Sequence, residues 1–295
     1  MDRLHVVTLA KNDRPGLAAT CKSVERQMGV RFHHHLVTGM STDGTEELAQ
    51  TLSRSDRVTH WTGAPPGIYE SMNWILRQVP SNDFIWFLNA GDVLTDECSI
   101  QRMYEALGFS SAEWCTSAFL VATRSGWVRD VVTVSEPWQP HDVGHQATVA
   151  RVALLEEAGG FPEVPRILAD AALMRRVMRN HTPAIVSEPT VIYTLGGFSS
   201  RHPMKVTREI AWLDRYLPLA GRDSLSASQG AKPSVGQMLL PLASALEGRA
   251  PRVSSLFVQP RGKRRRYVAA QLLSAPHWED HPVSSFSRAC CLSMS

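Results

Sequence analysis

The stretch GIYESMNWILRQVPSNDFIWFLNAGD, residues 67–92, decides how the rest of the chain can fold. Its apolar side chains first recur at helical spacing, at Ile68, Met72, Ile75, Leu76 and Val79. Pro80 ends that helix because proline cannot continue the hydrogen-bond ladder. The run at 84–88, FIWFL, is too short for a helix and is rich in strand-forming residues. The stretch therefore predicts a helix followed by a central parallel strand that is covered on both faces.

Polar and small residues follow the predicted strand without a break. Asn89 and Asp92 are separated by Ala90 and Gly91. In open α/β sheets ligands bind beyond the carboxyl ends of the strands, so this amide and this carboxylate are delivered to a position suited to chemistry. The two small residues leave room for a ligand. The sequence therefore predicts a ligand site at residues 89–92.

The segments GIYESMN, residues 67–73, and FIWFLNAGD, residues 84–92, resemble the GIYDAMN and FLNSGD pair of family 2 glycosyltransferases. The resemblance is to the bacterial polysaccharide-assembling group of the GT-A fold and extends from Val6 to about Ser200. Other segments occur in the family's order, namely STDGT at 41–45, HQ at 145–146, LLEEAGGFP at 154–162, LADAAL at 168–173 and LGGFS at 195–199. The resemblance implies an α/β fold in which a Rossmann-like mixed sheet is flanked by helices.

The resemblance and a change in composition divide the chain. Residues 1–218 are expected to form the GT-A domain, with a nucleotide-sugar half at 1–110 and an acceptor half at 111–218. From about Ala220 the sequence is rich in Gly, Ser, Ala and Pro. Residues 219–295 are therefore expected to form a basic C-terminal extension that is helical or partly disordered.

The remaining elements are predicted from apolar runs and turn residues. Strands are expected at 4–10, 33–37, 114–121, 126–134 and from 191, and helices at 15–27, 46–52, 96–107, 154–158 and 168–178. His33, His34 and His35 lie in a strand whose side chains alternate between two faces, so they cannot converge on one metal ion. The turn at 11–15 lacks GxGxxG, which counts against a nicotinamide-dependent dehydrogenase.

The resemblance implies a set of donor-binding residues. They are Asn12, Arg14, Thr38, Gly67, Tyr69, Asn73, Asn89, Ala90 and Gly91. A solvated helix cap explains Asn12 and Arg14 equally well. The chain departs from the family where an acid before STDGT is replaced by Thr38 or Gly39, and where Asp-Arg or Asp-Lys before GIY is replaced by Pro65-Pro66. These departures leave the donor base open and keep loss of activity as an alternative.

An acid stands in the first turn of the helix expected at 168–178. The helix dipole favours Asp170 there for structural reasons alone. The match of LADAAL to the family's acidic motif implies instead that Asp170 is the general base, which deprotonates the acceptor hydroxyl and gives inversion at the anomeric carbon. The family's second acid is replaced by Ala172, a further departure.

The departing diphosphate of a nucleotide sugar needs neutralising charge, which a divalent cation commonly supplies. The resemblance implies Mg or Mn, with Asp92 as a metal ligand and Asn89 at the first position of the family's DxD-type site. His202 is a second metal candidate. Candidates for acceptor or phosphate contacts are His145, Gln146 and Arg201. A solvated loop is the alternative for Arg201 and His202.

Composition limits the other possibilities. The chain has 295 residues and a net charge of +3, so no polyanion partner follows from its total charge, and no motif for nucleic acid accompanies its basic residues. Five cysteines show no metal spacing, and their odd number does not suggest a disulfide framework, which favours a reducing cytoplasm. No apolar run approaches the roughly 18 residues of a membrane span. We expect a cytoplasmic protein, free or at the inner face of the membrane.

The basic cluster Arg261–Arg266, followed by Tyr267–Leu273, suggests a peripheral membrane contact through residues 261–273. A solvated tail is the alternative. The expected activity is transfer of a sugar from a nucleotide-diphosphate donor to a glycan or lipid-linked acceptor, in surface glycan or secondary-metabolite assembly. A non-catalytic binding or assembly protein of the same fold is the main alternative. A nucleotidyltransferase is disfavoured because the chain lacks the Gly-rich, basic first loop that such enzymes need to bind a triphosphate.

Overall fold

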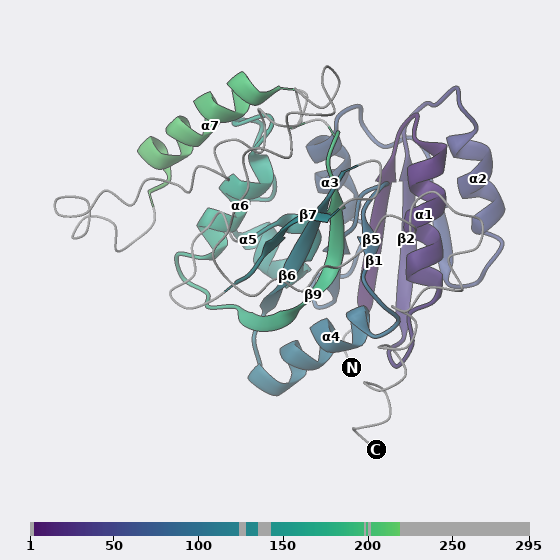
Figure 1. Ribbon diagram of the computed structural model, residues 1–295, viewed down its shortest axis with the longest axis horizontal. Helices are drawn as coiled ribbons and strands as arrows, with labels where there is room; N and C mark the ends of the chain where they lie inside the picture. The colour runs from purple at the N-terminus through teal and green to yellow at the C-terminus, as the bar shows by residue number, and fades with distance from the viewer. Residues whose placement is uncertain (1–2, 124–127, 135–142, 198, 200–201, 219–295) are drawn as a thin grey trace.

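The computed structural model describes residues 3–123, 128–134, 143–197, 199 and 202–218. In this part of the chain a nine-stranded mixed sheet has the order β3-β2-β1-β4-β8-β6-β9-β5, and β7 pairs with β6 (Figure 1). Its strands are β1 (Leu4–Ala10), β2 (Phe32–Thr38), β3 (Val58–Trp61), β4 (Phe84–Phe87), β5 (Val93–Leu94), β6 (Trp114–Ala122), β7 (Val128–Val132), β8 (Thr148–Arg151) and β9 (Ala184–Thr194). The helices are α1 (Arg14–Glu25), α2 (Thr45–Leu52), α3 (Ile68–Leu76), α4 (Ser99–Ser110), α5 (Val152–Glu157), α6 (Ala169–Val177) and α7 (Pro203–Tyr216), with a short 3₁₀ turn at His145–Ala147. This architecture confirms the expected fold class.

Strand β4 lies at the boundary between a parallel and an antiparallel region. It pairs in parallel with β1 but antiparallel with β8. The expectation of a parallel strand is therefore correct on one side only. An apolar run encodes burial on both faces but not the direction of its neighbours, and β8 reaches this position from a distant part of the chain.

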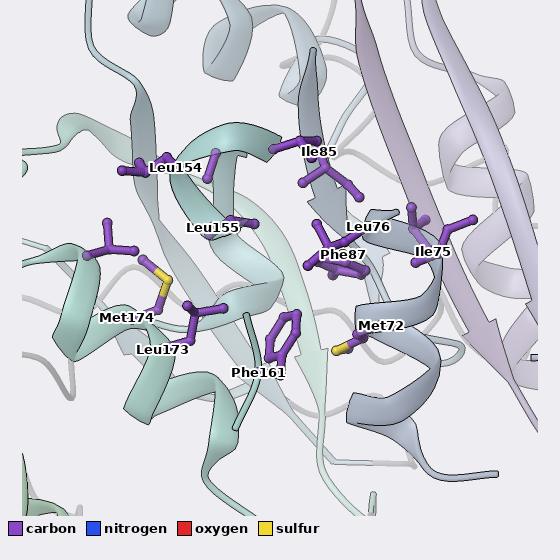
Figure 2. Packing of buried hydrophobic residues seen from close by; sticks show 14 of the residues in the cluster. Met72, Ile75, Leu76, Ile85, Phe87, Leu154, Leu155, Phe161, Leu173 and Met174 are labelled. Atoms are coloured by element: carbon purple, nitrogen blue, oxygen red, sulfur yellow. The ribbon is translucent and has the colours of Figure 1, made fainter. Parts of the chain in front are cut away.

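Side-chain alternation along the central strands divides the core between the two faces of the sheet. Trp86 packs on one face with residues of α1 and α4. Ile85 and Phe87 pack on the other face with α3, α5 and α6. Figure 2 shows Met72 of α3 near Phe161, with the α6 side chains beyond it. The FIWFL run thus anchors helices on both sides of the sheet, as expected.

Several predicted boundaries shift. Helix α1 ends at Glu25, and α4 begins only at Ser99. The Thr95 hydroxyl donates to the carbonyl of Pro189 at 2.7 Å, so it holds strand β9 in place rather than capping α4. Strand β9 begins at Ala184, earlier than expected, and α7 was not predicted.

The predictions for residues 219–295, including the membrane contact at 261–273, lie outside the described residues. Within the described ranges, no helix has the length and apolarity needed to cross a membrane. Cys21 and Cys115 are buried free thiols, whereas Cys98 is disulfide-bonded. The disulfide was not expected from the number and spacing of the cysteines.

Candidate active site

The turn at 89–92 continues from β4 at the carboxyl edge of the parallel strands. The backbone N–H of Asp92 donates to the carbonyl of Asn89 at 3.0 Å, which closes the turn. The hydroxyl of Thr20, on α1, accepts from the N–H of Gly91 at 3.0 Å and donates to the carbonyl of Asp92 at 2.7 Å. Gly91 has a φ of +97°, which a residue with a side chain rarely adopts. A buried hydroxyl and a glycine therefore fix the shape of this turn.

Asp92 is buried, with 5% of its surface exposed. One carboxylate oxygen, Oδ1, accepts the backbone N–H of Thr194 at 3.1 Å, and the Thr194 hydroxyl donates to the carbonyl of Gly91 at 2.7 Å. Burial raises the pKa of Asp92 to about 7, because this hydrogen bond and the charge of His145 offset only part of the lost hydration. A nearby cation would stabilise the ionised form of Asp92.

Asp170 begins α6 with both carboxylate oxygens engaged. Oδ2 accepts from Nδ1 of His145 at 2.6 Å. Oδ1 accepts from the Ala171 N–H at 2.9 Å and lies 3.0 Å from the Tyr69 hydroxyl. Burial alone would raise the pKa of Asp170, but the hydrogen bond and charge of His145, with these other contacts, hold it below its ordinary value. Asp170 is therefore ionised at neutral pH.

His145 connects Asp170 to the turn at 89–92. With Nδ1 donating to Asp170, Nε2 accepts from Nδ2 of Asn89 at 3.1 Å. Burial lowers the pKa of His145, yet the hydrogen bond that it donates to Asp170 and the charges of Asp170 and Asp92 outweigh this effect, so the net shift of the pKa is upward. The two acids thus act electrostatically on one imidazole.

Tyr69 and Glu209 hold the segment that precedes Asp170. The Tyr69 hydroxyl donates to the carbonyl of Ile167 at 2.6 Å. The Glu209 carboxylate, on α7, accepts three successive backbone N–H groups, from Arg166 at 3.1 Å, Ile167 at 2.8 Å and Leu168 at 2.9 Å. Helices α3 and α7 therefore set the position of the first turn of α6.

The predicted donor residues of the first loop bind the neighbouring loop. Oδ1 of Asn12 accepts the Thr42 N–H at 2.8 Å, and the Arg14 N–H donates to Asp43 at 3.0 Å. Asp43 also accepts from the N–H of Thr45, as a residue at the start of α2 is expected to do. A hollow of about 460 Å³ lies beside Arg14 along α2, between Asp43 and Thr51. Asp92, His145 and Asp170 do not line this hollow, so we do not assign it to the reaction.

Other predicted residues have structural partners. The buried hydroxyl of Thr38 lies 2.8 Å from Nε2 of His60. Both amide atoms of Asn73 bond the backbone of Phe161, at 2.7 and 2.8 Å. The carbonyl of Gln146 accepts from the Trp86 indole at 2.7 Å.

The structure places two more candidates at element ends. Gly67 precedes α3 with a φ of +113°. His202 precedes α7. Arg201 lies outside the described residues.

The oxygen atoms near the turn fit a divalent cation. Oδ1 of Asn89 is buried and has no hydrogen-bond partner within the part of the chain described. Asp92 has a raised pKa, as noted above. Among those same residues, no group of three or more His, Cys, Asp or Glu side chains is arranged to hold a metal ion. A cation here would therefore have few protein ligands and would need oxygen atoms from a bound diphosphate.

Comparison with known proteins identifies the chain. Residues 5–124 match the family model described as "Glycosyl transferase family 2". Residues 5–124 belong to glycosyltransferase family 2. A search of curated proteins gave no significant match.

Solved structures resemble this family 2 glycosyltransferase in fold. S. aureus TarS 1–349 in complex with UDP has a TM-score of 0.58 and 15% identity, over 75% of this chain and 68% of that one. The same protein in complex with UDP-GlcNAc gives a TM-score of 0.56 and 12% identity, over 82% and 79%. The mannosyltransferase PcManGT from Pyrobaculum calidifontis, in complex with GDP-Man and Mn2+, has a TM-score of 0.55 and 14% identity, over 86% of this chain and 77% of that one. These likenesses confirm the GT-A fold.

Three residues that position the site of the glycosyltransferase were not identified from the sequence. Thr20 and Thr194 hold the turn at 89–92, and Glu209 holds the segment before Asp170. Thr194 stands next to the LGGFS segment, which was a weak signal. Thr20 and Glu209 lie inside helices without a motif, so nothing local marked them.

Proposed function

We propose that this family 2 glycosyltransferase is an inverting enzyme that moves a sugar from a nucleotide diphosphate to a hydroxyl acceptor, in surface glycan or secondary-metabolite assembly. The observation that carries the proposal is the hydrogen-bonded chain from Asp170 through His145 to Asn89. It joins the candidate base to the turn that the family places at the donor. A helix cap alone would not require this connection.

Asp170 is proposed to accept the proton of the acceptor hydroxyl. It is ionised at neutral pH, and Oδ2, which accepts one hydrogen bond from His145, has a second lone pair for that proton. Because the base removes a proton while the hydroxyl attacks directly, a single displacement with inversion follows. His145 holds the carboxylate in place during this step by donating from Nδ1 to Oδ2.

The donor diphosphate is proposed to bind at the turn 89–92 with Mg or Mn. Asn89 and Asp92 would hold the cation through Oδ1 of the amide and the carboxylate, the hard oxygen ligands that these ions prefer. When bound, the cation supplies positive charge that stabilises the leaving diphosphate. Gly91 and Ala90 keep the approach to these groups free of larger side chains.

The test is an assay of purified full-length protein with UDP-, GDP- and dTDP-sugars, with and without Mn²⁺. We expect one donor to be hydrolysed or transferred with inversion, read from the anomeric configuration of the product by NMR. Asp170→Asn and Asp92→Ala should each remove the activity. Asp56→Asn, at an exposed acid in a turn, is the matched control and should leave it unchanged. Retention of configuration, or full activity of Asp170→Asn, would refute the mechanism.

The non-catalytic alternative has its own support. The family's acids are missing at Thr38 and Ala172, and Ala172 is fully buried, so an acid there would have no access to water. Thermal unfolding with a nucleotide diphosphate, combined with the turnover assay, distinguishes the two functions. A binding protein would be stabilised by a nucleotide diphosphate but would turn over no donor, whereas an enzyme would do both.

A further inference from the structure

Helix α7 presents a charged and aromatic outer face. Figure 1 shows α7 at the rim of the molecule, beside α6 and away from the sheet. Only Val206 and Leu213 of this helix are buried. Met204 is 72% exposed and Tyr216 is 54% exposed, which is unusual for large apolar side chains on one short helix. This outer face therefore differs from an ordinary solvated helix surface.

The acids of α7 are bound on its inner side. The Glu209 carboxylate accepts the three N–H groups of residues 166–168, and Asp214 forms an ion pair with Arg175 of α6 at 2.8 Å. The cations Lys205, Arg208 and Arg215 have no acid partner of this kind among the residues described. The outer face of α7 is therefore positively charged.

Aromatic rings accompany this charge. Trp212 and Tyr216 are one helical turn apart, with ring centroids 5.1 Å apart, and the Arg215 guanidinium lies 5.4 Å from the Tyr216 ring. Trp and Tyr are the side chains enriched at the level of lipid headgroups, where one end of the ring is apolar and the other is hydrated. Lys and Arg on the same surface attract anionic lipids.

We propose that the outer face of α7 is a docking surface for an anionic phospholipid membrane. Lys205, Arg208 and Arg215 bind headgroup phosphates, while Met204 and Tyr216 enter the interfacial layer. The rest of this chain is a poor occupant for the same face, because residues 219–295 carry ten Lys and Arg against four Asp and Glu and would repel it. The negative charge of an anionic membrane complements the positive charge of the outer face of α7 and of residues 219–295.

Docking through α7 would also orient the site. Glu209 joins α7 directly to the segment that carries Asp170, so the base side of the site would face the membrane. A lipid-linked hydroxyl acceptor held in that membrane would meet the site from this side. This last step rests on the proposed function, but the docking itself does not.

The test is co-sedimentation of the full chain with vesicles of phosphatidylcholine alone or mixed with phosphatidylglycerol. We expect binding to the mixed vesicles only, weakening as salt is raised. Arg208→Glu with Arg215→Glu should weaken it by more than about tenfold, since each surface cation contributes a factor of about five. Arg54→Glu with Arg57→Glu makes the same charge change at exposed sites elsewhere and should have a much smaller effect.

Two further measurements separate a loss of membrane binding at α7 from unfolding of the variant and from binding by the basic residues 263–266. If the charge reversal unfolds the protein, Lys205→Gln with Arg208→Gln is the milder variant, and a thermal melt reports folding. Replacing Lys263, Arg264, Arg265 and Arg266 by alanine should leave the α7 contribution in place. The proposal is wrong if the folded α7 variants bind as wild type, if only the change at 263–266 abolishes binding, or if no anionic vesicle is bound. Donor hydrolysis in solution is scored separately, so failure of the docking and failure of the glycosyl transfer are distinguishable.

Discussion

His145 donates from Nδ1 to Oδ2 of Asp170 across 2.6 Å, the shortest of the contacts that join the two acids of the site. The other ring nitrogen faces Asn89. The imidazole is therefore fixed at both ends, and its orientation depends on two segments that are 81 positions apart in the chain. A group held in this way positions its neighbours as well as itself.

Replacing His145 tests this coupling. His145→Gln keeps a polar side chain but cannot bond both Asp170 and Asn89 with the geometry of a ring. We expect kcat to fall by about 10²-fold, in the range of a lost acid–base group, with a smaller change in donor KM. Steady-state kinetics of His145→Gln provide the check, and a kcat equal to that of the wild type would contradict the coupling.

Replacing Glu209 tests the support of the base. Glu209→Gln keeps the size of the side chain but removes the charge that accepts the N–H groups of residues 166–168. Hydrogen bonds to a charged group stabilise more than neutral ones, so we expect the free energy of unfolding to fall by about 1–3 kcal/mol. Urea unfolding measures it. Glu157→Gln, at an exposed acid at the end of α5, is the control and should change stability by less than about 0.5 kcal/mol.

The sequence was most informative where a function depends on a local motif. The helix and strand at 67–88 and the polar turn after them could be found from spacing and residue type. The acid at the start of α6 was singled out only by the resemblance to the family's motif. The pairing of Asp170 with His145 could not be found in this way, because it joins α6 to a turn 25 residues earlier in the chain. Apolar periodicity contains no information about such partners.

Helix α7 shows a second limit of the sequence. Only two of its apolar residues, Val206 and Leu213, are buried, so its sequence gives little indication of what it packs against. Its position is set by Glu209 and Asp214, whose partners are about 40 residues away. Long-range polar contacts of this kind decide placement but leave no local pattern.

Two buried histidines predict how stability changes with pH. Burial lowers the pKa of His34 and of His35 to about 3. In the unfolded chain their pKa returns to about 6.5, so below that pH the unfolded state binds more protons than the folded state. The stability that comes from keeping these histidines neutral is therefore fully present above about pH 6.5. It is lost as the pH falls towards 3, by up to about 1.4 kcal/mol per pH unit for each histidine.

Urea unfolding at several pH values checks this dependence. His34→Gln retains a group that can bond the Thr8 hydroxyl, now 2.9 Å from His34 Nε2, but does not titrate. Between about pH 6.5 and 3, the free energy of unfolding of this variant should fall less steeply than that of the wild type, by the contribution of one histidine. A variant that declines as steeply as wild type would refute the assignment to His34.

Gly67 supplies the last prediction, because it starts the helix that carries Tyr69. Its φ of +113° is strained for any residue with a side chain, and a Cβ there would overlap the carboxylate of Glu70. We expect Gly67→Ala to lower the free energy of unfolding by about 1–3 kcal/mol. Gly108→Ala, in α4, meets nothing within 4 Å and should stabilise by about 0.5–1 kcal/mol instead. Opposite signs for the same chemical change, measured by urea unfolding, would show that the backbone conformation at Gly67 is the cause, and equal effects would show that it is not.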